Sequence, residues 1–357
     1  ALDGINLLLT IDKSIQFKTE SILKDAVTKH GADSGSITVV DPKTGAVLAM
    51  ATYPTFDPNN YSEATNLSVF NNQPATGNYE PGSIFKPLTI AASVNEGKIS
   101  ADTTYYDSGQ INIDGYTIKN SDEKAHGTQT MSQVLEESLN TGVIFAKNQI
   151  GNTTFLKYVK DFGFGEPTGI ELQETKGSLA NLTGNITVNF HTASFGQGLT
   201  VTPLQMVQAF TAFANGGKMM KPYIIQAKIE PSGKTVTTQP QVVREVITPK
   251  TASAVSAMLV NVVEKGHGKK AAVPGYYIAG KTGTAQVPRK DGKGYEKNNN
   301  IGSFIGYGPV EDPRFVAIVR INHPRDVVFA VPEDKLALLK TGDKVKRSEE
   351  RRVGKEC

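Results

Sequence analysis

Hydrophobic positions recur along this chain with two periods, and these periods predict where helices and strands lie. Residues 10–30 carry apolar side chains at helical spacing and Gly31 follows them, so a helix is predicted there. Two apolar runs at 36–40 and 46–52 are separated by the turn sequence DPKTG at 41–45, in which proline presets φ and glycine accepts a positive φ. We therefore expect a helix followed by a β-hairpin in the N-terminal part of the chain.

The rest of the chain alternates longer helical patterns with short strand patterns. A mostly helical, loop-rich block is predicted over residues 83–213, and it contains a long polar stretch from 100 to 130. Because strand patterns stand at both ends of the chain with helices between them, the sequence predicts an α/β fold: one antiparallel sheet flanked by helices, with block 83–213 as an inserted, mostly helical subdomain. The later elements are predicted as a helix at 251–264 and strands at 223–229, 276–287, 302–308 and 315–321.

The composition is that of an ordinary globular protein, and it narrows the function mainly by exclusion. The 357 residues are 38% hydrophobic, which is enough for a large core. The net charge is +3 and charges of both signs are interspersed, which argues against nucleic-acid binding. The five histidines are scattered singly, so the sequence gives no sign of a metal site, and we expect no cofactor.

Three short polar motifs stand in a fixed order and supply the groups that acyl transfer through a serine ester requires. They are SIFK at 83–86, SLN at 138–140 and KTGT at 281–284. Each motif is weak alone, because its spacing recurs elsewhere. The settings of the other copies explain them without catalysis. Ser21/Lys24 lies on a solvated helix face, Ser121/Lys124 lies in an all-polar loop, and Ser93/Asn95 lies too far along the helix from Ser83. KTG at 43–45 lies in a hairpin turn, and KTG at 340–342 lies in a tail.

Ser83 is predicted to open a helix. Pro81 and Gly82 end an extended approach, an apolar run follows, and Pro87 is tolerated only within the first helical turn. Free backbone N–H groups at a helix start favour developing negative charge, and Lys86 lies one turn on, on the same face. The serine is thus a candidate nucleophile with a lysine beside it. The alternative is a capping serine next to a surface lysine.

The other two motifs have settings that suit a cleft. SLN lies between a short helix with a capping-box pattern at 130–133 and a second helix, predicted over 141–150 and closed by Gly151. Ser138 and Asn140 project into a cleft there, or else form an ordinary turn. KTGT lies in a strand interrupted by two glycines, which is typical of close approach by a ligand or another backbone. Lys281 would give this strand a cationic edge; the alternative is an exposed strand with a bulge.

Together these motifs resemble those of the transpeptidase domain of class B penicillin-binding proteins, the bacterial peptidoglycan D,D-transpeptidases. The resemblance runs from about residue 4 to about residue 328, and its last segments are similar to division- and sporulation-type members. It implies the serine penicillin-recognising (β-lactamase/transpeptidase-like) fold. The further segments that agree in order are DPKTGAVLAM at 41–50, YEPGS at 79–83, FGFG at 162–165, TGI at 168–170, SFGQG at 194–198 and TPLQM at 202–206.

The resemblance also implies roles for the motif residues. Ser83 would attack a D-Ala-D-Ala stem peptide or a β-lactam, and Lys86 would accept its proton. Ser138 would relay that proton to the leaving nitrogen, while Asn140 would hold the peptide amide. The substrate carboxylate would be bound by Lys281 and by the stretch Thr282, Gly283 and Thr284, and the backbone N–H groups of Ser83 and Thr284 would form the oxyanion hole.

Two other functions stay open. A β-lactamase or β-lactam sensor domain would share the same motifs, although the sequence identifies no separate carboxylate for activating water. A catalytically inactive binding module is the second alternative, and the intact residues Ser83, Lys86, Ser138, Asn140 and Lys281 argue against it.

The resemblance further implies a place and partners. Class B proteins carry an N-terminal membrane anchor and a pedestal, neither of which is recognisable here, so we expect a fragment from the extracytoplasmic side of the cytoplasmic membrane. Expected partners are peptidoglycan stem peptides, β-lactam antibiotics, a glycosyltransferase, and divisome or elongasome membrane proteins. The transpeptidase domain is expected over residues 1–330. Residues 331–357 are expected to be a truncated, aberrant tail, in which 347–357 resemble a translated sequencing-adapter oligonucleotide.

Overall fold

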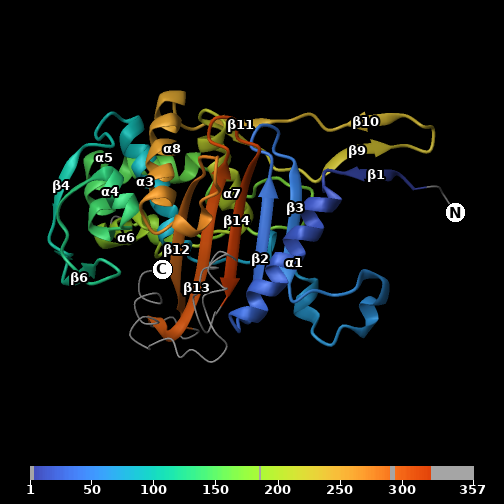
Figure 1. Cartoon of the computed structure of the whole chain (residues 1–357), viewed down its shortest axis with the longest axis horizontal. Helices are drawn as coiled ribbons and strands as arrows, with labels where there is room; N and C mark the ends of the chain where they lie inside the picture. The colour runs from blue at the N-terminus through green and yellow to red at the C-terminus, as the bar shows by residue number, and fades with distance from the viewer. Residues whose placement is uncertain (1–3, 185, 290–293, 323–357) are drawn as a thin grey trace.

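A five-stranded antiparallel sheet forms the centre of the fold (Figure 1). The structure is a computed structural model that describes residues 4–184, 186–289 and 294–322, so the expected tail at 331–357 lies outside the described residues. The two ends of the chain supply neighbouring strands, which confirms the predicted fold class. In order across the sheet, the strands are β12 (Ala279–Pro288), β13 (Tyr295–Gly308), β14 (Phe315–Asn322), β2 (Ser34–Val40) and β3 (Val47–Tyr53).

The turn between β2 and β3 has the form that its sequence predicts. The Gly45 N–H donates to the Asp41 carbonyl at 2.8 Å, and the φ of Gly45 is +85°. A Cβ at this position would lie 2.1 Å from the Lys221 carbonyl oxygen. Glycine is therefore required both for its φ and for the close approach of another segment.

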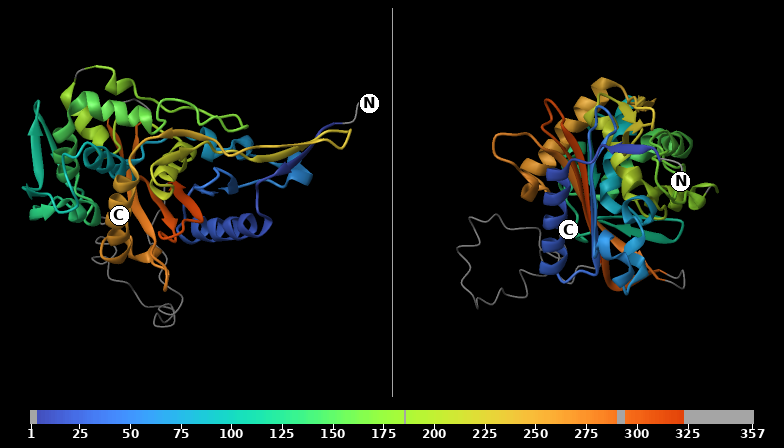
Figure 2. Two further views of the ribbon diagram at one scale, coloured as in Figure 1. Left: turned by 90° about the horizontal axis from the view of Figure 1, so that it is seen from above. Right: turned by 90° about the vertical axis from the view of Figure 1, so that its right-hand side faces the viewer.

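Helices cover both faces of the sheet. The helix α1 (Lys13–Lys29) begins at Asp12, whose carboxylate accepts hydrogen bonds from two backbone N–H groups of the first turn at 2.8 and 2.9 Å. This cap makes α1 start later than the predicted residue 10. Leu23 and Val27 of α1 are buried against the sheet. The helices α7 (Pro203–Ala214) and α8 (Pro249–Glu264) pack into the other, larger core cluster, which contains Ile305, Tyr307 and Ile318 of the sheet. Figures 1 and 2 show α7 on the face opposite to α1.

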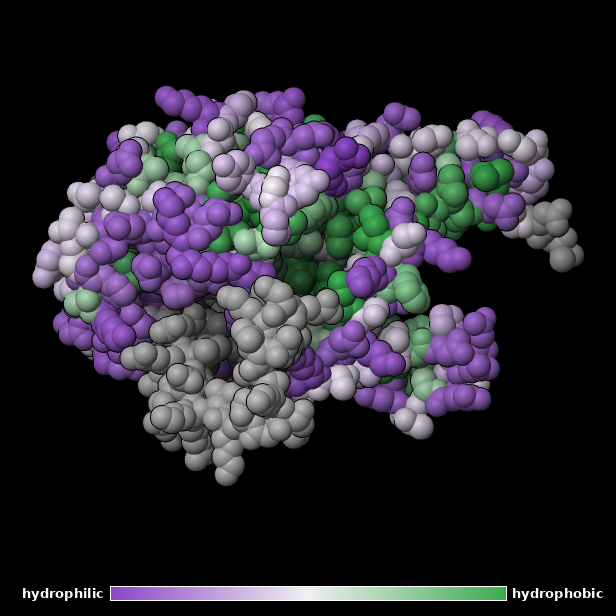
Figure 3. All heavy atoms as spheres, viewed as in Figure 1, coloured by the Kyte–Doolittle hydropathy of each residue, from purple (hydrophilic) through white to green (hydrophobic). Residues whose placement is uncertain are grey.

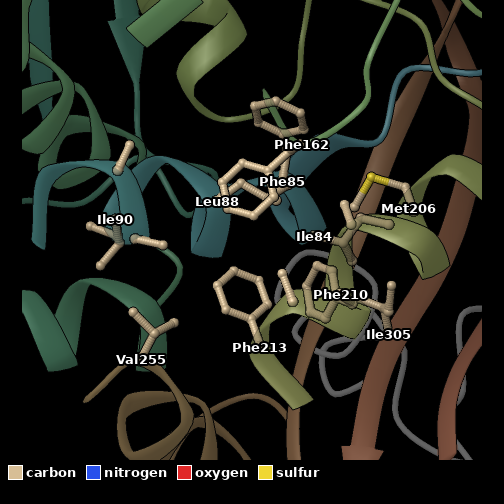
Figure 4. Close-up of a cluster of buried hydrophobic side chains, with 14 of the residues drawn as sticks. Ile84, Phe85, Leu88, Ile90, Phe162, Met206, Phe210, Phe213, Val255 and Ile305 are labelled. Atoms are coloured by element: carbon tan, nitrogen blue, oxygen red, sulfur yellow. The ribbon is translucent and has the colours of Figure 1, made fainter. Parts of the chain in front are cut away.

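The block at 83–213 packs around an aromatic core. The ring of Phe85 lies 5.2 Å from that of Phe164, and Phe210 lies 5.1 Å from Phe213 (Figure 4). Gly151, predicted to end a helix, adopts φ 74° and ψ 172°; the chain then resumes a helix, so the predicted end is a kink. The helices here are α3 (Lys86–Asn95), α4 (Met131–Glu136), α5 (Asn140–Asp161), α6 (Thr187–Ser194) and α7.

The polar stretch at 100–130 contains four short strands that were not predicted. Each strand has only four residues, so the polar–apolar alternation of QINI at 110–113, for example, is at the lower limit of the length that indicates a strand. They form two antiparallel pairs: β4 (Thr104–Asp107) with β7 (Gly127–Thr130), and β5 (Gln110–Ile113) with β6 (Tyr116–Lys119).

A three-stranded arm projects from the body at the N-terminal end (Figures 1 and 2). It consists of β1 (Asn6–Leu9), β9 (Ile225–Ile229) and β10 (Thr235–Thr237), and Leu7, Leu8 and Leu9 are about half exposed on it. Figure 3 shows hydrophobic surface along the arm. The strand predicted at 223–229 thus begins two residues later. A separate two-stranded antiparallel sheet pairs β8 (Lys218–Met220) with β11 (Val242–Glu245).

Several short helical segments complete the described part. They are α2 (Gln73–Thr76) and the 3₁₀ turns η1 (Pro58–Glu63), η2 (Leu67–Phe70), η3 (Gly82–Phe85), η4 (Ala180–Leu182) and η5 (Lys269–Ala271). Across the described residues, every helix is too short or too polar to cross a membrane.

Candidate active site

Ser83 lies in the 3₁₀ turn η3, which leads directly into helix α3. Pro87 falls in the first turn of α3, as its sequence position predicts, and the Lys86 N–H donates to the Ser83 carbonyl. A 3₁₀ turn has three residues per turn, so side chains at i and i+3 lie one above the other. This geometry places Ser83 and Lys86 on one face.

The hydroxyl of Ser138 joins two lysine side chains. Lys86 is fully buried, and its Nζ donates to the Ser138 carbonyl and, at 3.1 Å, to the Ser138 Oγ. Lys281 is also fully buried; its Nζ donates to the same Oγ at 3.0 Å and to the Thr282 carbonyl at 3.1 Å. One residue from each of the three motifs therefore meets at the Ser138 hydroxyl: Lys86, Ser138 itself and Lys281.

Both lysines are poor sites for a positive charge. Burial, together with the charge of nearby Lys281, lowers the pKa of Lys86 well below its usual range. Burial lowers the pKa of Lys281 to about 7. Both shifts favour the neutral amine, and a neutral amine next to a serine hydroxyl can accept its proton.

Ser138 is held in an unusual backbone conformation between α4 and α5. Its φ is +57°, in the left-handed region that non-glycine residues rarely adopt. The predicted capping box of Thr130 and Gln133 starts α4, and the Leu139 N–H donates to the Val134 carbonyl at 2.9 Å. The turn so fixed directs both the carbonyl and the hydroxyl of Ser138 at Lys86.

The KTGT strand forms one wall of a cavity of about 210 Å³. Ser83, Ser138, Thr282, Gly283 and Thr284 all line this cavity. The Oγ1 of Thr284 is buried, and none of the described residues gives it a hydrogen-bond partner. An unpaired hydroxyl in a cavity wall is suited to bind a polar group of a ligand.

Gly283 allows the KTGT strand to touch the serine turn, the 3₁₀ turn η3 (Gly82–Phe85) that carries Ser83. A Cβ at Gly283 would lie 2.9 Å from Cγ2 and 3.2 Å from the backbone nitrogen of Ile84, and 2.7 Å from the Oγ of Ser303. A Cβ at Gly82, whose φ is +58°, would lie 3.0 Å from the Thr284 carbonyl oxygen. The close approach expected from the glycines in this strand is therefore made by the serine turn itself.

Two predicted residues have different surroundings from those expected. Lys281 was expected to give a cationic strand edge that a substrate would meet, but its side chain is buried, and its amine shares the Ser138 hydroxyl with that of Lys86. Asn140 was expected to face the substrate, but its Nδ2 donates to the Lys119 carbonyl at 2.8 Å, and the described lining of the cavity does not include it. The strand predicted from 276 begins at Ala279, which leaves Tyr276 and Tyr277 outside it.

A second, charged part of the cavity wall was not predicted from the sequence. It contains two carboxylates, each near a histidine: Asp122 Oδ2 lies 2.8 Å from His126 Nε2, and Glu137 Oε2 lies 3.7 Å from His267 Nε2. The copy of the first motif at Ser121 and Lys124, interpreted as an all-polar loop, belongs to this wall as well. No periodic signal marks these residues, because they meet only through the tertiary fold.

A buried carboxylate holds this wall in place. Asp107 is fully buried and accepts hydrogen bonds from the Thr141 hydroxyl at 2.7 Å, the Asn120 amide at 2.8 Å, and the backbone N–H groups of Gly109 and His126 at 2.9 and 3.0 Å. Asp107 thereby ties the loop that carries Asp122 to Thr141 in the first turn of α5. Asp107 is a structural support for the cleft that the sequence did not reveal.

Those of the remaining motif copies that lie within the described residues have the structural settings predicted for them. Ser21 and Lys24 are exposed on α1, and KTG at 43–45 lies in the hairpin turn. Ser93 is buried, and its Oγ donates to the Ala146 carbonyl at 2.8 Å. The copy at 340–342 lies outside the described residues.

The sequence and the fold match those of known proteins. The family model of the penicillin binding protein transpeptidase domain matches residues 35–333. Stage V sporulation protein D of Bacillus subtilis is 40% identical over 331 residues, which cover 91% of this chain and 51% of the relative. Peptidoglycan D,D-transpeptidase FtsI of Escherichia coli is 32% identical, with 90% and 52% covered. The crystal structure of penicillin binding protein 3 from Mycobacterium tuberculosis, complexed with aztreonam, is 32% identical with a TM-score of 0.85, and the match covers 90% of this chain and 73% of that one.

The chain therefore belongs to the penicillin-binding protein transpeptidase family. Within that family it is a class B domain similar to the sporulation and FtsI proteins, which confirms the resemblance drawn from the motifs. The chain spans about half the length of the curated relatives it matches.

Proposed function

We propose that this domain is a peptidoglycan D,D-transpeptidase that cross-links cell-wall stem peptides through an acyl-enzyme on Ser83, and that β-lactams acylate the same serine. The observation that carries the proposal is the Ser138 hydroxyl, shared by two buried lysine amines in a cavity that Ser83 also lines. Such a group can move a proton between the serine and a leaving nitrogen.

Acylation begins when the Ser83 Oγ attacks the carbonyl carbon of the penultimate D-Ala. Its proton passes to neutral Lys86, and the backbone N–H groups of Ser83 and Thr284 stabilise the oxyanion. Each such donor contributes about 3–4 kcal/mol in comparable sites. The C–N bond then breaks, Lys86 returns its proton through the Ser138 Oγ to the leaving nitrogen, and the terminal D-Ala departs.

Transfer reverses these steps with a new nucleophile. An amine of a neighbouring strand attacks the ester carbonyl and loses a proton to Lys86 through Ser138. The bond to the Ser83 Oγ breaks, and Lys86 returns the proton to that oxygen. The unpaired Thr284 hydroxyl and Thr282 would hold the substrate carboxylate during acylation, and Lys281 would act through Ser138.

The wider setting of the domain is also part of the proposal. The class B resemblance supports a place on the extracytoplasmic side of the cytoplasmic membrane, where cell-wall stem peptides are cross-linked. It likewise supports a glycosyltransferase and division, elongation or sporulation membrane proteins as partners. The domain itself is proposed to span residues 1–330, with 83–213 as its inserted subdomain.

Labelling with a fluorescent penicillin tests the assignment of the nucleophile. The wild-type protein should become covalently labelled. Ser83→Ala should not be labelled, although its melting temperature should equal that of the wild type. Ser21→Ala, an exposed serine with a lysine at the same spacing, is the matched control and should label normally. Undiminished labelling of a folded Ser83→Ala protein would refute the assignment.

A further inference from the structure

A carboxylate is buried next to the proposed nucleophile without taking part in the mechanism above. Glu80 lies three residues before Ser83, and only 8% of it is exposed. Glutamate is rarely buried unless it is hydrogen-bonded, because desolvation of the charge is costly. A buried glutamate at this position therefore requires an account of what it binds.

Each oxygen of Glu80 accepts a hydrogen bond from a different segment. The Gly198 N–H donates to Oε1 at 3.0 Å, and the Tyr295 hydroxyl donates to Oε2 at 3.0 Å. Burial, together with the neighbouring carboxylate, raises the pKa of Tyr295, so the phenol stays protonated as a donor. Glu80 thus joins the loop that follows α6 to the first residue of strand β13.

The same loop also supports the serine turn through its backbone. The Gly82 N–H donates to the Gly196 carbonyl at 3.0 Å, and Tyr79 and Val201 exchange hydrogen bonds at 3.0 and 2.9 Å. A Cβ at Gly196 would lie 2.2 Å from the Gly82 carbonyl oxygen. The serine turn therefore rests directly on residues 196–201, with Glu80 at the centre of the contact.

Tyr295 carries this contact to the substrate-binding strand. Strand β13 pairs with β12 along its length, with Gly302 opposite Thr284 and Tyr295 opposite Pro288. The hairpin is thus held to the serine turn at two places: at Gly283, which touches Ile84, and at Tyr295, which binds Glu80. Both contacts bear on how far the KTGT wall stands from Ser83.

We propose that Glu80 and Tyr295 are positioning residues, which hold the β12–β13 hairpin at the spacing from Ser83 that acylation requires. This inference rests on the proposed function, since it concerns the rate at which Ser83 is acylated. A displacement of about 1 Å in a reacting geometry can cost as much as a hundredfold in rate. Loss of the Tyr295 hydroxyl should therefore slow the chemical step more than it weakens the initial binding of the β-lactam.

The chain offers a matched control on the same strand. Tyr307 lies on β13 as well, is fully buried, and shares a hydrogen bond of 2.6 Å with the Ser256 Oγ on α8, away from the cavity. Ser256 also donates to the Ala252 carbonyl, so Tyr307→Phe leaves it a partner. Tyr295→Phe and Tyr307→Phe thus each remove a phenol oxygen from the same strand. Only Tyr295 contacts Glu80, in the segment that leads into the serine turn.

The experiment measures penicillin acylation by stopped flow over a range of concentrations, which separates the dissociation constant of the initial complex from the acylation rate constant. We expect Tyr295→Phe to lower the acylation rate constant about tenfold or more, within the hundredfold limit for misplacement, and Tyr307→Phe to change it less than about twofold. Equal acylation rate constants in the two variants, at similar melting temperatures, would overturn the proposal.

Substitution of Glu80 gives a second readout. Glu80→Gln keeps an acceptor for the Gly198 N–H and an amide that can donate to the Tyr295 oxygen. We expect it to acylate within about threefold of wild type, whereas folded Glu80→Ala should be as slow as Tyr295→Phe or slower. A Glu80→Ala protein that acylates at the wild-type rate overturns the proposal. Failure of the wild-type protein itself to be acylated would instead refute the proposed function.

Discussion

Replacing Lys281 by methionine should change how the stability of the protein depends on pH. An exposed lysine in the unfolded chain has a pKa of 10.5, whereas burial lowers that of Lys281 to about 7. One pKa unit corresponds to about 1.4 kcal/mol, so the buried site disfavours the charged amine by an amount on the order of 5 kcal/mol. This penalty destabilises the folded state, and methionine would remove it along with the charge.

The sign of the effect follows from where the proton is bound. Below pH 7 Lys281 is protonated in both states, so the full penalty applies. Between pH 7 and 10.5 the unfolded chain still binds the proton while the folded protein releases it, so stability rises with pH. The contribution of Lys281 between pH 7 and pH 9 is about 2 kcal/mol. Lys86, whose pKa is also lowered by burial and by the charge of Lys281, adds to the rise in the same direction.

Urea denaturation at pH 7, 8 and 9 measures this dependence. The free energy of unfolding of the wild type should rise over this interval, and that of Lys281→Met should rise by about 2 kcal/mol less, since the methionine has no proton to release. Lys24→Met removes an exposed lysine from α1 and should keep the wild-type slope. If Lys281→Met and wild type showed the same dependence of stability on pH, the Lys281 amine would not carry the penalty inferred from its burial.

Two further predictions concern the cleft. Gly283→Ala should lower the rate of penicillin acylation at least tenfold and cost about 1–3 kcal/mol of stability, because its Cβ would lie 2.9 Å from Ile84 Cγ2. Gly302 on the neighbouring strand is the control: a Cβ there would meet nothing within 4 Å, so Gly302→Ala should be acylated normally. The penicillin acyl-enzyme should persist for minutes or longer, because a transpeptidase, unlike a β-lactamase, does not hydrolyse it efficiently. A chromogenic cephalosporin should accordingly turn over negligibly. Sustained turnover faster than about 1 s⁻¹, an ordinary enzymatic rate, would favour a β-lactamase, and Asp122→Asn and Glu137→Gln would then show whether either cleft carboxylate activates water.

Local sequence signals predicted the elements whose cause is local. Gly45 fixes a hairpin turn through its own φ, Pro87 restricts where α3 begins, and the capping box at Thr130 starts α4. The central sheet followed from strand patterns at both ends of the chain. The four strands within 100–130 were not predicted, because each has only four residues and buries little, so its alternation is at the lower limit of a strand signal.

The parts of the site that depend on contacts between distant segments could not be predicted from the chain alone. Nothing near Lys281 in the sequence indicates that its amine is buried beside Ser138. Asn140 lies at the motif position expected to face the substrate, yet its amide donates to the carbonyl of Lys119, the last residue of β6. Glu80 is next to a turn that the motifs identified, but its partners Gly198 and Tyr295 are far from it along the chain.

Ser83 is proposed to form an acyl-enzyme with a stem peptide and to pass the acyl group to an amine. Mass spectrometry can detect this intermediate in protein that is quenched during turnover of a D-Ala-D-Ala-terminated stem peptide and then digested. We expect a mass increase equal to the peptide minus one D-Ala, located on the fragment that contains Ser83, and a decrease of this adduct when an amine acceptor is added. An adduct on a different residue, or release of D-Ala by Ser83→Ala protein, would contradict the proposal.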